Sequence, residues 1–282
     1  PLSALHLGRL IADALPPGVV NIIADNNDLG DKITTHKGIS KISFTGSTAT
    51  GARVMASAAS TLKRITLELG GNDAGIIMDD VDVEAVAPQI FDGAFGNNGQ
   101  ICIAMKRVYA HESIYDKLVE QLAKLAEEAI VGNGLEQGTQ LGPLQNKMQF
   151  EKVKDYIEDG RANGTIVAGG DVPEGKGYFI PPTIVRDIDD DSRLVKEEQF
   201  GPVLPVIKYG DVDEVIARAN DSDYGLGGSV WSSDIDRAYE VAKKVDSGTI
   251  WVNKHADLQP HVPFGGIKTS GIGTCLLYTS DA

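Results

Sequence analysis

The protein has 282 residues and a formal net charge of −14 at pH 7, with 42% hydrophobic and 23% charged residues. This composition is ordinary for a globular protein of one or two domains, and the acidic balance argues against nucleic acid as a partner. The two cysteines, Cys102 and Cys275, are too few for a disulfide framework, so we expect a reducing, cytoplasmic location. No run approaches the roughly 20 apolar residues that span a bilayer, so no membrane partner is expected.

Hydrophobic periodicity predicts an alternation of helices and strands from the first residues onward. A helix with leucines at helical spacing ends at Pro16-Pro17-Gly18, and the apolar run at residues 19–23 follows as a buried strand. Strands are then expected at residues 41–44 and 64–69, on either side of a helix that ends at Ala59. Short connections between such elements are typical of a parallel sheet with crossover helices.

The same alternation continues along the rest of the chain. We expect further strands at residues 74–78, 107–111, 203–209, 228–231 and 249–253, and helices at residues 83–95, 114–130, 145–162, 212–219 and 235–245. Together the elements predict an α/β fold of two Rossmann-like units with parallel sheets, divided near Gly70-Gly71.

The two ends of the chain differ from this pattern. Pro1 opens on a helix without a methionine, and residues 275–282 continue no helical or strand period. We interpret the chain as a fragment that has lost its N-terminal part and its natural C-terminus. Residues 275–282 are expected to be a non-native tail and are left out of the fold prediction.

A first motif, Phe44-Thr45-Gly46-Ser47-Thr48-Ala49-Thr50-Gly51, joins a predicted strand to a predicted helix. Glycine lets the backbone approach a ligand, and the free N–H groups at a helix start attract an anion such as a dinucleotide pyrophosphate. A Ser or Thr helix cap after a tight turn explains the same residues. The lysine of a phosphate-binding P-loop is missing, and the chain has no G-x-G-x-x-G motif.

A second motif, Asn98-Gly99-Gln100-Ile101-Cys102, places a thiol just after a glycine-containing loop. Such a loop exposes the thiol and aims backbone N–H groups at a developing oxyanion, but a thiol with a pKa near 8.5 needs help from its surroundings to react. The alternative is a buried structural thiol. None of the five histidines is singled out as a papain-type partner.

Two carboxylates are candidates for chemistry. Glu68 lies between two leucines in a predicted strand, where burial would raise its pKa toward the range of a general base. A strand residue on the polar face of the sheet is an equal alternative. Glu198 precedes the strand at residues 203–209 and is suited to accept hydrogen bonds from ribose hydroxyls, although a solvated loop charge fits the same position. The glycine-rich segment at residues 263–271 is compatible with a surface loop.

Taken in this order, the motifs resemble those of the aldehyde dehydrogenase superfamily from Pro1 to about Thr274. Each motif alone is weak, but six in one order are specific. The matching segments are Pro16-Pro17-Gly18-Val19-Val20-Asn21, Phe44-Thr45-Gly46-Ser47-Thr48, Leu67-Glu68-Leu69-Gly70-Gly71, Asn98-Gly99-Gln100-Ile101-Cys102, Glu198-Gln199-Phe200-Gly201-Pro202 and Pro263-Phe264-Gly265-Gly266-Ile267-Lys268. The resemblance implies that residues 1–69 are the C-terminal part of a dinucleotide-binding domain and that residues 70–274 are the catalytic domain.

The family resemblance also implies roles for individual residues. In this family the cysteine of the G-Q-x-C motif is the nucleophile and the glutamate of the E-L-G-G motif is the general base, which implies Cys102 and Glu68. The implied cofactor is NAD, with NADP as an alternative, and no metal is required. The implied cofactor contacts are Thr45, Gly46, Ser47, Gly51 and Leu69, with Glu198 at the nicotinamide ribose and Phe200 near the nicotinamide ring.

The implied reaction is oxidation of an aldehyde to a carboxylic acid through a thioester on Cys102, which Glu68 helps water to hydrolyse. The whole enzyme is expected to be a homodimer or homotetramer. Upstream elements of the family, including an asparagine of the oxyanion hole, are absent, so we expect the chain alone to be inactive or poorly folded. The polar loop Asp25-Asn26-Asn27 replaces a glycine that the family often has near the cofactor, which disfavours a ribose phosphate.

Two other classes of function remain open. A cysteine-dependent hydrolase without cofactor would use Cys102 and Glu68 but leaves the Gly46-Ser47-Thr48 turn and Glu198 unexplained. A binding protein that kept the fold but lost catalysis would have no need of both Cys102 and Glu68. The implied aldehyde pocket, at residues 103–105 and 254–261, is mixed in polarity and selects no particular aldehyde.

Overall fold

In the computed structural model, which describes residues 1–26, 28–173 and 175–276, the chain forms two compact units. The first unit comprises residues 1–42 and 52–65, and the second comprises residues 43–51 and 66–282. Asn27 of the polar loop and residues 277–282 of the expected tail lie outside the described residues.

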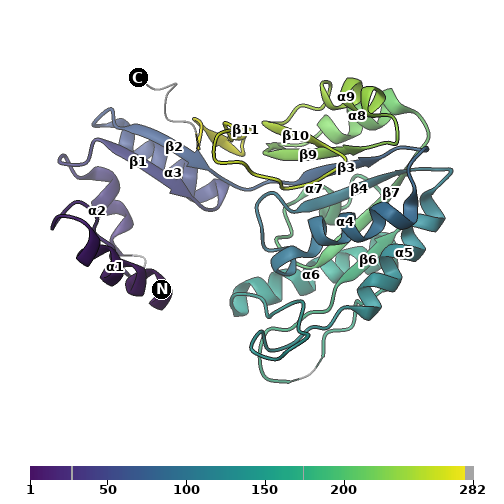
Figure 1. Cartoon of the computed structure of the whole chain (residues 1–282), viewed down its shortest axis with the longest axis horizontal. Helices are drawn as coiled ribbons and strands as arrows, with labels where there is room; N and C mark the ends of the chain where they lie inside the picture. Colours follow the sequence, from purple (N-terminus) through teal and green to yellow (C-terminus); the bar gives the residue numbers. More distant parts are fainter. Residues whose placement is uncertain (27, 174, 277–282) are drawn as a thin grey trace. The chain divides into compact units, whose positions relative to one another are not determined.

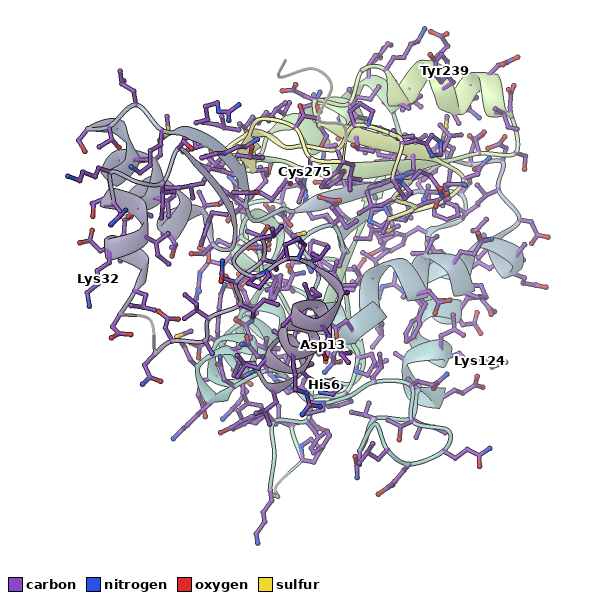
Figure 2. The ribbon with its side chains drawn as sticks, turned by 60° about the vertical axis from the view of Figure 1, so that its left-hand side comes forward. His6, Asp13, Lys32, Lys124, Tyr239 and Cys275 are labelled. Atoms are coloured by element: carbon purple, nitrogen blue, oxygen red, sulfur yellow. The ribbon has the colours of Figure 1, made fainter. Side chains whose placement is uncertain are left out.

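The first unit contains helices α1 (Leu2–Ala14) and α2 (Gly30–Thr35) and most of α3 (Thr48–Ala59). Helix α1 buries none of its residues, and Figure 2 shows the side chains of His6 and Asp13 along it. The strand predicted at residues 19–23 is wrong, since this segment is irregular and mostly exposed. A strand needs a neighbour to bond its backbone N–H and C=O groups, and no described strand pairs with this segment.

The second unit is built on a seven-stranded sheet with the order β10-β9-β3-β4-β7-β6-β5. All neighbouring strands are parallel except β5 and β6, which are antiparallel. The strands are β3 (Asp73–Ile77), β4 (Met105–His111), β5 (Thr165–Ala168), β6 (Thr183–Arg186), β7 (Val203–Tyr209), β9 (Gly227–Trp231) and β10 (Thr249–Val252). The predicted α/β fold with a parallel sheet is confirmed.

Helices cover both faces of this sheet (Figure 1). One face packs against α4 (Val83–Phe95) and α5 (Tyr115–Glu128). The other packs against α6 (Lys147–Asn163), the short α7 (Arg193–Lys196), α8 (Val212–Asn220) and α9 (Ile235–Ala242). Side chains of a strand alternate between the faces, so Val108 and Ala110 of β4 join the α4–α5 core while Tyr109 joins the other. Because helices cover both faces of the sheet, successive side chains of each strand are buried. The strand sequences are therefore nearly continuous apolar runs.

The outer surfaces of these helices face solvent. Figure 2 shows Lys124 on α5 and Tyr239 on α9 projecting from the helices, and both side chains are exposed. The amphipathic helices therefore place one stripe on the sheet and the other in solvent.

Two smaller sheets complete the described chain. One has the order β1-β2-β12, from β1 (Lys41–Thr45), β2 (Arg64–Glu68) and β12 (Gly271–Ile272), and the other pairs β8 (Tyr224–Gly225) with β11 (Ile267–Lys268). Strand β12 is antiparallel to β2 and sets Gly271 opposite Glu68. The glycine-rich segment is therefore more than a surface loop, because it returns the end of the chain to the strand that carries Glu68.

Candidate active site

The loop that carries the thiol follows helix α4 through one turn of 3-10 helix, η1 (Gly96–Gly99). Asn97, Asn98 and Gly99 have φ angles of 51°, 58° and 69°, which lie in the left-handed region. Asparagine and glycine tolerate this region best, and such strained backbone persists only where the surrounding structure holds it. A Cβ at Gly99 would lie 2.4 Å from the Gly201 carbonyl oxygen, so glycine is required there. The sequence of this loop thus specifies one backbone path into Cys102.

Cys102 is half-buried at the end of this loop. Burial raises the pKa of its thiol, and the carboxylates of Asp73, Glu198 and Glu68 raise it further, while a backbone hydrogen bond with Ile103 lowers it. The thiol is therefore protonated at neutral pH and needs a nearby positive charge or base to become a nucleophile.

Glu68 is the last residue of β2, and its side chain is buried. Burial raises the pKa of its carboxyl group, and a hydrogen bond with the Cys275 side chain lowers it. Cys275 reaches this place because its backbone pairs with Phe264, with N–H to oxygen distances of 2.7 and 3.1 Å. Apart from Cys275, neither carboxylate oxygen of Glu68 has a hydrogen-bond partner among the described residues. The carboxylate is thus buried and available to a small polar molecule.

Gly70-Gly71 connects β2 to β3 and lets three parts of the site approach one another. The Gly71 N–H donates to Oε1 of Glu198 at 3.0 Å. A Cβ at Gly70 would lie 2.5 Å from Oε2 of Glu198, and a Cβ at Gly71 would lie 2.4 Å from the carbonyl oxygen of Cys102. Only residues without side chains fit between the thiol loop and Glu198.

The topology of the sheet explains why these residues meet. Gly70-Gly71 precedes β3, Cys102 precedes β4, and Glu198 precedes β7. Strands β3, β4 and β7 are neighbours in the sheet and are parallel. Their amino ends therefore lie along one edge, and the loops that enter them converge there.

A cavity of about 480 Å³ opens at this edge. Seven predicted site residues line it: Thr45, Gly46, Ser47, Leu69, Cys102, Glu198 and Phe200. Gly51 is buried behind Leu69, and a Cβ at Gly51 would lie 2.4 Å from a Leu69 methyl carbon. Glu68 is outside the lining, although it acts electrostatically on Cys102. The cavity is also lined by five residues that had not been predicted: Gly70, Gln100, Ile101, Gln149 and Lys152.

Ser47 caps helix α3, since the Thr50 N–H donates to its hydroxyl oxygen at 3.3 Å. The helix-cap interpretation of this motif is therefore correct. A capping side chain accepts a hydrogen bond from only one backbone N–H group at the start of a helix. The remaining N–H groups of the first turn have no acceptor within the helix. The turn is thus both a cap and a place on the cavity wall where a phosphate would be stabilised.

Gln149 and Lys152 of α6 hold the loop that carries Glu198. The Gln149 side chain donates to the carbonyl oxygens of Gln199 and Phe200 at 2.9 and 2.8 Å. The Lys152 ammonium donates to the Glu198 carbonyl oxygen at 2.9 Å. Sequence patterns could not identify these two residues, because a polar residue on an amphipathic helix looks the same whether it faces solvent or a loop.

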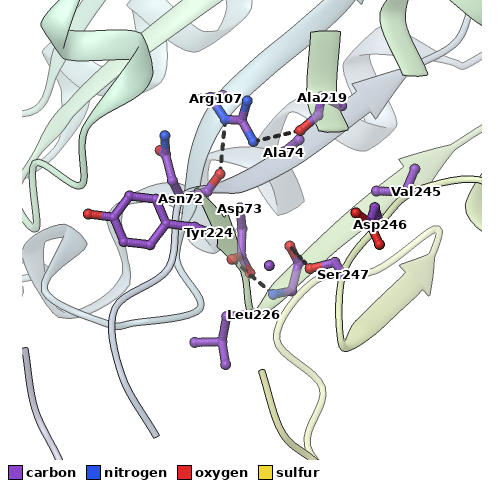
Figure 3. A pocket seen from close by; sticks show the side chains of 12 residues that line it. Asn72, Asp73, Ala74, Arg107, Ala219, Tyr224, Leu226, Val245, Asp246 and Ser247 are labelled. Atoms are coloured by element: carbon purple, nitrogen blue, oxygen red, sulfur yellow. Dashed lines mark hydrogen bonds between the residues drawn. The ribbon is translucent and has the colours of Figure 1, made fainter. Parts of the chain in front are cut away.

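A buried polar cluster lies beneath the thiol loop and was also not predicted. Oδ1 of Asp73 accepts from the Gly227 N–H at 3.1 Å, beside a cavity of about 10 Å³ (Figure 3). Arg107 donates to the carbonyl oxygens of Asn72 and Ala219 at 2.9 and 3.1 Å. Burial raises the pKa of Asp73 to about 7. The base of the site therefore contains a carboxyl group that titrates near neutral pH.

His255 supports the segment just after Cys102. Its Nε2 lies 2.7 Å from the Ile103 carbonyl oxygen and its Nδ1 lies 3.0 Å from the Ser229 hydroxyl oxygen. Burial lowers the pKa of His255 to about 4, so the ring is neutral and donates from Nε2. Its role is to anchor the loop, with both ring nitrogens engaged.

Within residues 1–26, 28–173 and 175–276, no group of three His, Cys, Asp or Glu residues is placed to hold a metal ion. In the same part of the chain, no helix is both long and apolar enough to cross a bilayer.

The parallel sheet, the cavity lined by the Cys102 thiol and Glu198, and the buried Glu68 nearby define an α/β protein equipped for covalent chemistry. Residues 1–279 match the family model described as "Aldehyde dehydrogenase family". The chain belongs to the aldehyde dehydrogenase family.

Individual relatives agree with this assignment. The chain is 44% identical over 276 residues to the putative aldehyde dehydrogenase DhaS of Bacillus subtilis (strain 168), covering 97% of this chain and 56% of that protein. The NAD+ complex of an aldehyde dehydrogenase from Bacillus cereus has a TM-score of 0.94 and 42% identity, with 97% and 56% covered. An NADP-dependent enzyme from E. coli has a TM-score of 0.93 and 35% identity, with 97% and 58% covered. The chain thus spans about half the length of the relatives it matches.

Proposed function

We propose that this chain is the thiol-bearing part of an NAD(P)-dependent aldehyde dehydrogenase, with Cys102 as nucleophile and Glu68 as general base. The observation that carries the proposal is convergence: Cys102 and Glu198 line one cavity, and Glu68 is buried close enough to influence the thiol electrostatically. The names of the solved relatives, an NAD+ complex and an NADP-dependent enzyme, support the cofactor class. A homo-oligomeric, cytoplasmic enzyme and the division into domains at residues 1–69 and 70–274 belong to the same proposal.

The cavity residues fit a dinucleotide. The start of α3 at Gly46 and Ser47 is suited to the pyrophosphate, and Leu69 gives an apolar wall. Oε1 of Glu198 is engaged by the Gly71 N–H, and this hydrogen bond orients Oε2 to accept from ribose hydroxyls. Phe200 gives an aromatic wall for the nicotinamide ring. Thr45 continues this wall. Gly51 contributes indirectly, because its lack of a side chain lets Leu69 pack closely against it.

The protein residues then perform a two-stage reaction. The Cys102 thiol loses its proton to solvent, its sulfur bonds to the aldehyde carbon as the carbonyl π bond breaks, and the resulting oxyanion is stabilised by the Cys102 backbone N–H. The chemistry that NAD(P) supplies when bound is acceptance of the hydride from that carbon, which leaves a thioester on Cys102. Glu68 takes a proton from a water molecule, whose oxygen attacks the thioester carbon. The carbon–sulfur bond breaks, the sulfur takes the proton held by Glu68, and the carboxylic acid leaves with Cys102 restored as a thiol.

The two residue roles are separable by kinetics. The test protein has the N-terminal portion of a relative fused ahead of Pro1, and it is assayed for NADH production with an aldehyde. We expect Cys102→Ala to remove both the first turnover and the steady state, by at least about 10³-fold. We expect Glu68→Gln to keep a burst of one NADH per active site but to slow the steady state by about 10²–10⁴-fold, because only deacylation needs the base.

The control variant is Glu128→Gln, since Glu128 is exposed at the end of α5. It should leave both phases unchanged. Unchanged activity in Cys102→Ala or Glu68→Gln would refute the assigned roles. Ester hydrolysis that depends on Cys102, with no NADH formed from any aldehyde, would instead identify a cofactor-free hydrolase.

A further inference from the structure

Lys106 is a fully buried lysine that contacts both loops of the site. It lies on β4, and its residue is 1% exposed. Its ammonium donates to the Gly99 carbonyl oxygen at 2.5 Å and lies 5.5 Å from the centre of the Phe200 ring. Its own carbonyl oxygen accepts from the Gln199 side chain at 3.3 Å. One residue therefore joins the thiol loop, residues 96–102, to the ribose loop, residues 197–202.

The charges around this ammonium are mostly negative. Glu198, Asp73 and Cys102 favour its charged form, whereas burial and Lys152 oppose it. Burial is the largest effect and lowers the pKa of Lys106 to about 8. For two of these groups the attraction is mutual, since Lys106 lowers the pKa of Glu198 and of Asp73. The side chain is thus a buried cation placed among acidic groups, next to Gly99 of the thiol loop.

Burying an ammonium group costs free energy of desolvation, which hydrogen-bond acceptors and negative charges around it must offset. Here the thiol must ionise close to three carboxyl groups, those of Asp73, Glu198 and Glu68. Each of them disfavours the negative charge of the Cys102 thiolate. A positive charge in contact with the same loop reduces this repulsion. The hydrogen bond to Gly99 also fixes the left-handed turn that leads to Cys102.

We propose that Lys106 is a positioning residue for the thiol chemistry: its ammonium ties the thiol loop to the ribose loop and supplies the positive charge that favours the Cys102 thiolate. The inference rests on the proposed function, because it assumes that Cys102 is the nucleophile. Lys106 lies outside the six motifs. It affects the chemistry through Gly99 and Cys102 and requires no contact with substrate.

The test is the pH dependence of Cys102 alkylation by iodoacetamide in the 282-residue chain, with the Cys102 peptide quantified by mass spectrometry. In Lys106→Met, which keeps the side-chain length without charge, we expect the alkylation rate at pH 7, where Lys106 of the unmodified chain is still charged, to fall about tenfold. The control, Lys124→Met on the exposed surface of α5, should match the unmodified chain.

A purely structural role for Lys106 predicts the opposite sign. A loosened loop would expose the thiol, bring its pKa down toward the ordinary value near 8.5 and speed alkylation. Faster or unchanged alkylation in Lys106→Met would therefore overturn the proposal.

A second measurement leaves Lys106 intact and applies if Lys106→Met does not fold. The chain is labelled with ¹³C at lysine Cε, and the buried lysine that titrates near pH 8 is followed by NMR in the unmodified chain and in Cys102→Asp. A carboxylate at position 102 carries the negative charge that the protonated thiol lacks near pH 8, so it should raise the pKa of this lysine, and an unchanged pKa contradicts the coupling. Neither readout uses dehydrogenase turnover, so failure of the proposed function, seen as unchanged activity in Cys102→Ala, is distinguished from failure of this inference.

Discussion

At the scale of single residues, the site depends on ionisable groups held out of water. Glu68, Asp73, Cys102 and Lys106 all have pKa values shifted mainly by burial, and the shift in each case favours the neutral form. Neutral groups cost less to bury, and their charges appear when a neighbour of opposite charge or a ligand arrives. The same burial that prepares the site for chemistry makes its stability depend on pH.

Asp73→Asn tests this dependence. The folded-state pKa of Asp73 is raised from 3.8 to about 7, so its contribution to stability is present below about pH 4 and is lost as pH rises through about 7. Asparagine keeps the acceptor for the Gly227 N–H and cannot ionise. We therefore expect Asp73→Asn to stabilise the chain relative to the unmodified protein at about pH 8, with little gain at about pH 4.

The measurement is the melting temperature of both proteins across this range. Asp155→Asn is the matched control, because Asp155 is exposed on α6. A melting-temperature difference for Asp73→Asn that is the same at both ends of the range would contradict the assigned titration.

At the scale of elements, the site is a set of loops that enter neighbouring strands. Their conformations are unusual: Asn97, Asn98, Gly99 and Phe200 all have positive φ. Such strain is tolerated because α6 and Lys106 hold the loops through hydrogen bonds to their carbonyl oxygens. The helices and strands of the second unit therefore act as a rigid frame for strained connections.

Gly99→Ala tests this view of the thiol loop. The added Cβ would meet the Gly201 carbonyl oxygen at 2.4 Å, and alanine disfavours a φ of 69°. We expect the free energy of unfolding, measured in urea, to fall by about 1–3 kcal/mol. Gly134→Ala is the control, since a Cβ there meets nothing within 4 Å. Equal stability of the two variants would show that the thiol loop is not held tightly.

At the scale of the whole molecule, the chain matches about half the length of its relatives. Assayed alone with an aldehyde and NAD or NADP, the 282-residue chain is expected to form no measurable NADH or NADPH. The resemblance places an oxyanion-hole donor outside this chain, and loss of one such donor costs about 10²–10³ in rate. The Bacillus cereus aldehyde dehydrogenase, assayed in parallel, serves as positive control, and product formation by the isolated chain would refute the expectation.

Local signals in the sequence were sufficient for most elements of the second unit. The helix at residues 83–95 and the strand at residues 203–209 were predicted with their observed bounds. Strands β5, β6 and β12 were missed, because they are short and depend on tertiary pairing: β5 with β6, β6 with β7, and β12 with β2. The strand predicted at residues 19–23 is wrong, because no strand among the described residues lies beside this apolar run to pair with it.

The sequence by itself determined which residue types stand at the turns: the Gly-Ser-Thr helix start, the Glu-Leu-Gly-Gly segment, the thiol and the Glu198 loop. These are local properties, set by glycine, capping residues and apolar spacing within a few positions. Only the tertiary structure decided that three of the loops share one edge, because that depends on β3, β4 and β7 being parallel neighbours. The same adjacency brings Asp73 of β3 and Lys106 of β4 to the site, and the packing of α6 on the sheet adds Gln149. These contacts join residues far apart in the chain, so no short stretch of sequence reveals them.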